Sequence, residues 1–169
     1  MRYFQIITLV LTIISVVIAL FNLFQLRKTY YANHERAAKK DTIDAFHDLK
    51  IKSKDTEKFL YLKYRYNPIV LSDLSEEKKF EIKQYLSILE RFSLGVNIGV
   101  YNINIANALS GAFFINTFNQ LQPYIKEIRR ERIDNNLYEE FEHMTNELVK
   151  IREKYSSTGG KPRFYPVSK

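Results

Sequence analysis

The chain has 169 residues, a net charge of +7 and no cysteine. The lack of thiols excludes disulfides and thiolate chemistry, which suits a cytoplasmic domain. The charge is uneven, because residues 27–40 carry five basic and one acidic side chains while residues 41–155 have a net charge of −1. We therefore consider nucleic acid an unlikely partner of the main domain and keep it as a second interpretation for the basic C-terminal tail alone.

The first element is an uncharged apolar segment, Tyr3–Leu26. A helix needs about 20 apolar residues to cross a bilayer core, whereas buried helices and signal peptides seldom contain so long a run. We predict an uncleaved transmembrane anchor over residues 1–28, and the positive-inside rule then places the C-terminal part in the cytoplasm, with the N-terminus outside. The residues expected at anionic lipid headgroups are Arg27, Lys28, Arg36, Lys39 and Lys40.

Polar and small residues within this segment recur at helical spacing, and we call them the polar seam. They are separated by 3, 4, 3, 4 and 3 positions: Gln5, Thr8, Thr12, Ser15, Ala19 and Asn22. This is the spacing of a left-handed helix pair, and such residues drive helix association in lipid, so we expect a homo-oligomer. The alternative is that the hydroxyls bond their own helix. A conducting path along the seam is less well supported, because no ionisable residue marks one.

The next elements are helices. No Gly or Pro interrupts residues 27–54, so the anchor helix is expected to continue, with Ile43, Phe46 and Leu49 on an apolar edge. A separate short helix is predicted over residues 57–66, ending before Pro68. Ser75 and the acids after it then start a helix that runs to about Ile98.

Gly99 is the predicted stop of that helix, and Asn102 caps the following one, which runs to about Arg132. Pro123 is expected to kink or split it. Asn136 is expected to cap the last helix, with Glu139 as its capping-box partner. Each of these three helices has an apolar stripe. In the helix that starts at Ser75 it consists of Ile82, Leu86, Leu89, Phe92 and Val96, and in the helix capped by Asn102 it consists of Phe114, Phe118, Leu121, Ile125 and Ile128. In the last helix it consists of Leu137, Phe141, Met144, Leu148, Ile151 and Tyr155.

These patterns predict an all-α fold, in which one N-terminal transmembrane helix is followed by a compact cytosolic bundle of four to five helices. We expect the cytosolic domain to cover residues 29–155 and residues 156–169 to form a basic, disordered tail. The segment 92–125 is also free of charge and is a candidate for membrane contact. Its six asparagines favour a hairpin in the soluble core, since unpaired amides are costly in lipid.

The sequence contains no recognised motif for catalysis, a metal or a cofactor. The three histidines do not stand at ligand spacing, and Gly95 and Gly99 lack the Gly-Lys-Ser/Thr of a phosphate loop, so we interpret them as sites of close helix approach. The basic residues near position 130 favour a solvated, ion-paired face. The sharper hypothesis is an anion or nucleotide site, for which the candidate residues are Arg91, Asn97, Lys126, Arg129 and Arg130.

The motif Glu90-Arg91-Phe92-x-x-Gly95-Val96-x-x-Gly99-Val100-Tyr101-Asn102 resembles a bacterial family of unknown function. The resemblance extends over about residues 30–150, including Asn33-His34-Glu35-Arg36 and Tyr138-Glu139-Glu140-Phe141-Glu142. It implies one N-terminal helix in the bacterial inner membrane and a small helical cytosolic domain. Small anchored proteins of this kind resemble membrane-acting partners in phage defence, which is an analogy.

Three functional hypotheses follow. The first is a non-enzymatic, self-associating membrane protein whose cytosolic domain binds a protein partner or a signal. The second is a membrane-tethered sensor of an anionic, nucleotide-like ligand. The third is an enzyme with an unrecognised acid pair such as Glu139 and Glu142, and no motif supports it.

Overall fold

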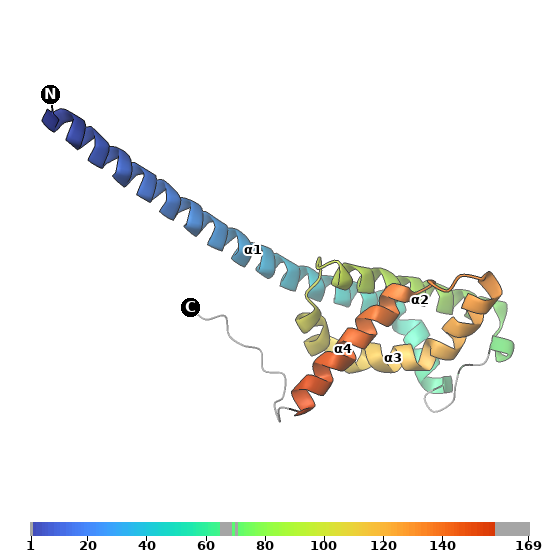
Figure 1. Ribbon diagram of the computed structural model, residues 1–169. Helices are drawn as coiled ribbons and strands as arrows, with labels where there is room; N and C mark the ends of the chain where they lie inside the picture. The colour runs from blue at the N-terminus through green and yellow to red at the C-terminus, as the bar shows by residue number, and fades with distance from the viewer. Residues whose placement is uncertain (1, 65–68, 70, 158–169) are drawn as a thin grey trace. The chain divides into compact units, whose positions relative to one another are not determined.

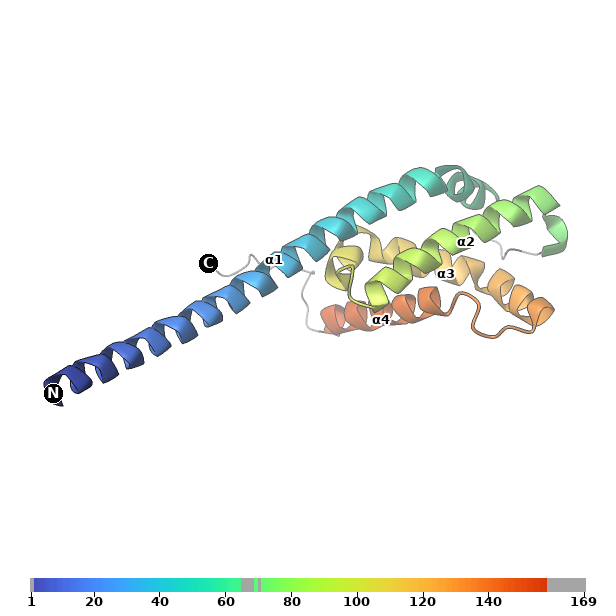
Figure 2. The same ribbon diagram turned by 90° about the horizontal axis from the view of Figure 1, so that it is seen from above.

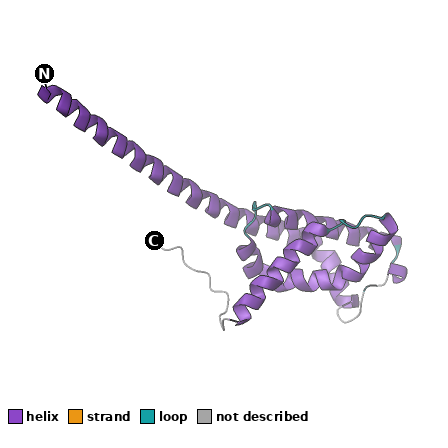
Figure 3. Ribbon diagram, in the orientation of Figure 1, coloured by secondary structure: helices purple, strands orange, loops and turns teal. Residues whose placement is uncertain are grey.

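The computed structural model describes residues 2–64, 69 and 71–157, although the side chains of residues 2, 8–10 and 71 lie outside this description. The described chain is all-α, as predicted, and contains four α-helices and one short 3-10 helix (Figures 1 and 3). The elements are α1 (Arg2–Tyr64), η1 (Leu71–Asp73), α2 (Glu76–Asn97), α3 (Ile103–Arg132) and α4 (Glu139–Ser157).

The chain divides into two compact units between Ala37 and Ala38, inside α1. This division separates groups of residues that contact one another. The predicted ranges 1–28 and 29–155 were set by hydropathy, so the division does not test them and they stay predictions. Most of the predicted tail, residues 158–169, lies outside the described residues.

Helix α1 runs without interruption over 63 residues. Neither Gly nor Pro occurs within it, so no residue removes a backbone hydrogen bond or favours a break. The prediction that the anchor helix continues is confirmed. The prediction of a separate helix over residues 57–66 is wrong, because no breaker separates residue 54 from residue 57 and the two stretches form one helix.

Within the described residues, α1 is the one helix long and apolar enough to cross a membrane. The large apolar side chains described in its first part are exposed, among them Phe4 at 76% and Leu26 at 71%. In the core helix of a soluble protein, such side chains would be buried against other parts of the chain. Here they are exposed, so this surface is not packed as a soluble core is.

Local start and stop signals set the next two helices as predicted. The Ser75 hydroxyl accepts a hydrogen bond from the Lys78 N–H at 3.3 Å and caps α2. The Asn102 side chain accepts from the N–H groups of Asn104 and Ile105 and caps α3. Between them Gly99 has a φ of +79°, a left-handed conformation that glycine adopts without a steric penalty.

The prediction that Pro123 splits α3 is wrong, whereas the kink predicted there as the alternative stays a prediction. Pro123 lies inside α3, and the helical backbone is interrupted instead at Ser110, where φ is −165° and ψ is 36°. Ser-Gly pairs are a common cause of helix kinks, and Ser110 precedes Gly111.

The predicted apolar stripes form the core of the bundle. All five stripe residues of α2 and all five of α3 are buried, as are Phe141, Met144 and Leu148 of α4. Helix α4 lies against both α2 and α3 (Figures 1 and 2). On α1 the apolar edge is shorter than expected, because Leu49 is buried but Ile43 is 48% exposed.

The start of α4 differs from the predicted capping box. The helix begins at Glu139, and its first free N–H groups are bound from α2: the Glu90 carboxylate accepts from Glu140 at 3.1 Å and from Phe141 at 2.8 Å. Burial raises the pKa of Glu90, and these two hydrogen bonds oppose that rise. Asn97 adds bonds from its amide to the Glu140 carbonyl (3.0 Å) and carboxylate (2.6 Å). The cap thus comes from a residue fifty positions away and joins α2 to α4.

Candidate functional site

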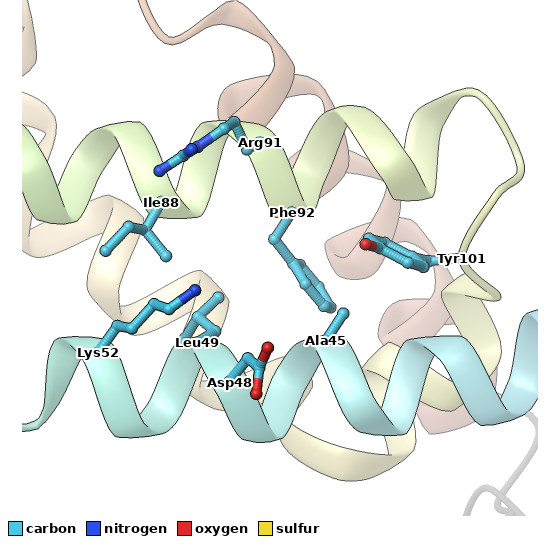
Figure 4. Close-up of a pocket in the computed structure, with 8 residues that line it drawn as sticks. All are labelled: Ala45, Asp48, Leu49, Lys52, Ile88, Arg91, Phe92 and Tyr101. Carbon is cyan, nitrogen blue, oxygen red and sulfur yellow. The ribbon is translucent and has the colours of Figure 1, made fainter.

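A hollow of about 220 Å³ lies between α1, α2 and the turn that follows α2 (Figure 4). Its apolar lining consists of Ala45, Leu49, Ile88 and Phe92, and its polar lining of Asp48, Lys52, Arg91 and Tyr101. Figure 4 shows Lys52 and Asp48 extending from α1, Arg91 above them on α2, and the Tyr101 hydroxyl facing the same space. We call this space the α1/α2 hollow.

The polar groups of the hollow are available to a ligand. Arg91 Nε donates to the Ser87 carbonyl at 3.3 Å, which fixes the side chain along α2 and leaves its terminal nitrogens for other partners. In the described part of the chain, neither Asp48 nor Lys52 takes part in an ion pair with another side chain. Two cations and one carboxylate over an apolar floor suit a small anion, particularly one that also offers a hydrogen-bond donor to Asp48.

Gly95 provides the space for one wall of the hollow. A Cβ atom at this position would lie 2.4 Å from Tyr101 Cε2, so any side chain here would displace the ring. The ring of Tyr101 stacks on Phe92 with centroids 5.4 Å apart, and the Tyr101 N–H donates to the Gly95 carbonyl at 2.8 Å. The sequence-based interpretation of Gly95 and Gly99 as points of helix approach is therefore wrong: Gly95 admits a tyrosine ring, and Gly99 makes the turn.

Thr42 attaches this turn to α1. Its hydroxyl is fully buried, accepts a hydrogen bond from the Asn102 N–H at 2.7 Å and donates to the Ala38 carbonyl at 2.5 Å. This hydrogen bond joins α1 to the N-cap of α3, next to Tyr101 in the sequence.

The structure gives the predicted anion-binding residues different surroundings, although Lys126, Arg129 and Arg130 lie within about one turn of α3. Arg91 lines the hollow, whereas Asn97 binds Glu140. Arg129 donates to the Leu137 carbonyl at 2.8 Å and lies 2.9 Å from the Glu142 carboxylate. Lys126 and Arg130 are exposed on α3.

Sequence reasoning missed Asp48, Lys52 and Tyr101. Asp48 and Lys52 stand four residues apart on one helix face, which is a common surface pattern, so their spacing gave little signal. Tyr101 lies within the motif from Glu90 to Asn102, and the unusual density of glycines there was the available signal. The described residues contain no group of three or more His, Asp or Glu side chains arranged to hold a metal.

The polar seam lies on the uninterrupted helix α1, so its spacing places its members on one face. Gln5, Thr12, Ser15, Ala19 and Asn22 are exposed, and the side chain of Thr8 lies outside the described residues. Ser15 Oγ donates to the Leu11 carbonyl at 2.9 Å, so its hydroxyl proton is used within the helix while the oxygen can still accept.

The family described as a domain of unknown function (DUF4760) matches residues 9–148. The chain belongs to this family. The matched DUF4760 region begins inside the apolar segment and ends within α4, so it includes the polar seam from Thr12 onward and every residue of the α1/α2 hollow. No curated protein and no solved structure matches the chain.

The close approach of Tyr101 to Gly95 predicts a non-additive effect on stability. Gly95→Ala should lower the free energy of unfolding by about 1–3 kcal/mol, because the new methyl group collides with the ring. In a Tyr101→Ala background the same change should have little effect, since the colliding ring is gone. Chemical denaturation of the full chain in detergent micelles, followed by near-ultraviolet circular dichroism, measures both values.

Gly99→Ala is the matched control for this cycle. A Cβ atom there meets nothing within 4 Å, and its effect comes from the positive φ alone. It should lower stability by about 1 kcal/mol in both backgrounds. Equal losses for Gly95→Ala with and without the Tyr101 ring would contradict the assigned contact.

Proposed function

We propose that this DUF4760 protein is a membrane-anchored, non-enzymatic, self-associating protein whose helical domain binds a partner or signal and thereby changes the association of its anchors. The observation that carries the proposal is that one helix, α1, contains both the apolar segment and one wall of the α1/α2 hollow. A ligand that alters the packing of α1 against α2 acts directly on the helix that continues into the anchor.

The membrane assignment rests on residues 3–26. This stretch exceeds the roughly 20 apolar residues that a transmembrane helix requires, and its described large side chains have no protein cover. The basic residues from Arg27 to Lys40 follow it, and by the positive-inside rule they support a cytoplasmic location of the helical domain. An effector role in phage defence remains an analogy within this proposal.

Self-association rests on the polar seam. In lipid, helices gain little from burying apolar side chains against each other, so close packing and hydrogen bonds between helices drive their association. The seam offers Ala19 and Ser15 for close approach and the amides of Gln5 and Asn22 for hydrogen bonds. The bond from Ser15 to Leu11 supports the alternative at position 15, whereas Ala19 has no hydroxyl with which to bond its own helix.

The seam predicts face-specific cross-linking, and the chain is suited to the test because it has no cysteine. Ala19→Cys should form interchain disulfides in native membranes far more readily than Val17→Cys, which lies at nearly the same depth on another face of the helix. Adding Ser15→Leu and Asn22→Leu should weaken association by about 1–2 kcal/mol and reduce the Ala19→Cys product. Equal cross-linking at positions 17 and 19 would contradict the seam.

A tethered sensor of an anionic ligand is the second candidate function, and the α1/α2 hollow favours it. The volume of about 220 Å³ lies below the range of about 300–1,000 Å³ typical of sites that enclose a whole organic ligand. The hollow therefore suits a phosphate or other small anionic group held by Arg91 and Lys52, with any nucleoside part of a larger ligand outside it.

Thermal unfolding of the full chain in micelles tests this with inorganic phosphate, pyrophosphate, AMP and ATP as probes. Binding should raise the stability of the folded domain, by about 2.7 kcal/mol at a hundredfold excess over Kd. Arg91→Ala should abolish the rise. Arg130→Ala, which removes the same charge from an exposed site on α3, should retain it. Equal loss in both variants would indicate general charge screening and reject the hollow as the site.

A further inference from the structure

The α1/α2 hollow holds a carboxylate beside its two cations, and this carboxylate selects among anions. Asp48 and Lys52 extend from α1 toward α2, and Arg91 lies across the hollow on α2 (Figure 4). We propose that the hollow binds a phosphorylated sugar, whose phosphate contacts Arg91 and Lys52 and whose hydroxyl groups donate hydrogen bonds to Asp48. This ligand class rests on the sensor function proposed above and makes it more specific.

Asp48 is the group that a bare phosphate would leave without a partner. A carboxylate accepts hydrogen bonds, and it repels the oxygens of an anion placed beside it. An acid and a base four residues apart on a helix often pair. Asp48 and Lys52 have this spacing, yet within the described part of the chain neither forms an ion pair. A ligand that brings hydroxyl donors would satisfy the carboxylate, whereas inorganic phosphate would not.

The net charge of the hollow decides which kind of donor fits. Its lining contains two cations and one carboxylate, so its net charge is +1. An amino-acid zwitterion would also offer a donor to Asp48, but it has no net charge and would leave one cation uncompensated. A phosphate monoester carries a charge of about −1.5 to −2, and sugar hydroxyls are neutral donors. Carboxylates accept hydrogen bonds from ribose hydroxyls in the same way in dinucleotide-binding folds.

The size of the hollow sets how much of such a ligand it encloses. Its volume of about 220 Å³ is smaller than a site for a whole organic ligand. Asp48 is exposed, whereas Leu49 and Phe92 of the apolar lining are buried. We therefore expect the phosphate in the hollow, the sugar hydroxyls at its mouth beside Asp48, and any base on the sugar in solvent. Free sugar phosphates and nucleotides share these two groups.

Two polar groups of the hollow are already held in place for this ligand. The Tyr101 ring stacks on Phe92, and the Tyr101 N–H donates to the Gly95 carbonyl at 2.8 Å, while its hydroxyl faces the hollow (Figure 4). Arg91 is oriented by the bond from its Nε to the Ser87 carbonyl at 3.3 Å. Groups that are held before binding lose less conformational entropy when a ligand arrives. A hydroxyl can donate to a phosphate oxygen or accept from a sugar.

Two nucleotides that differ only in their sugar hydroxyls test the proposal. ATP and 2′,3′-dideoxy-ATP carry the same base and the same phosphates, but only ATP can donate ribose hydrogen bonds to Asp48. Isothermal titration calorimetry of the full chain in micelles measures both Kd values. The Kd of ATP should be about tenfold lower than that of the dideoxy analogue, because hydrogen bonds to charged groups are among the stronger ones.

Asp48→Ala should remove this preference and bring the two Kd values within about twofold of each other, because the acceptor is gone. Asp44→Ala is the matched control. It removes the same charge one turn earlier on α1, from an exposed residue that does not line the hollow, and should keep the preference for ATP. A preference that survives Asp48→Ala, or that both variants reduce equally, would overturn the role of Asp48.

These ligands also separate the sugar assignment from the proposed sensor. Equal binding of both nucleotides that is lost in Arg91→Ala would leave an anion site in the hollow and overturn the sugar assignment. Absence of binding by ATP, AMP and ribose 5-phosphate would overturn the sensor and the sugar assignment together. With the preference for ATP established, ribose 5-phosphate that binds as tightly as AMP supports a free sugar phosphate as the ligand, and weaker binding supports a nucleotide.

Discussion

The rest of this structure depends on the unbroken backbone hydrogen bonding of α1. Each turn of the helix repeats the i to i−4 bond, and no Gly or Pro within its 63 residues interrupts the series. The same helix carries the polar seam, the basic residues after it, and the side chains that form one side of the hollow. The proposed seam and the proposed binding site thus belong to one helix of the sequence.

The motif from Glu90 to Asn102 makes the second set of constraints, and most of its positions have a definite geometric role. Glu90 binds the free N–H groups of α4, Gly95 leaves space for the Tyr101 ring, Gly99 supplies the left-handed turn and Asn102 caps α3. Arg91 is the exception, since its side chain is exposed and its hydrogen bond is to the Ser87 carbonyl of its own helix. A charged side chain beside a hollow, within a motif otherwise explained by packing, is the best candidate for a functional residue in the domain.

Much of this fold could be predicted from local signals, and the remainder could not for a common reason. Ser75 and Asn102 act on N–H groups two or three residues away, so their capping roles were visible in the sequence. The α2 and α3 stripes depend only on helical periodicity and were also correct. The cap from Glu90, the partner of Gly95 and the pairing of Arg129 with Glu142 depend on which helices lie side by side. Two residues of the predicted anion site, Arg129 and Asn97, bond groups at the start of α4, which their sequence positions could not show.

The proposed control of anchor association by the α1/α2 hollow is the central claim, and cross-linking with and without a ligand tests it most directly. The measurement follows interchain disulfide formation by Ala19→Cys in inverted membrane vesicles, with ATP as the probe, in chains that carry either Arg91 or Arg91→Ala. The account predicts that ATP changes the yield of cross-linked chains when Arg91 is present and leaves the yield unchanged in the Arg91→Ala chain. A yield that ATP leaves unchanged in both chains, or changes equally in both, would contradict the claim.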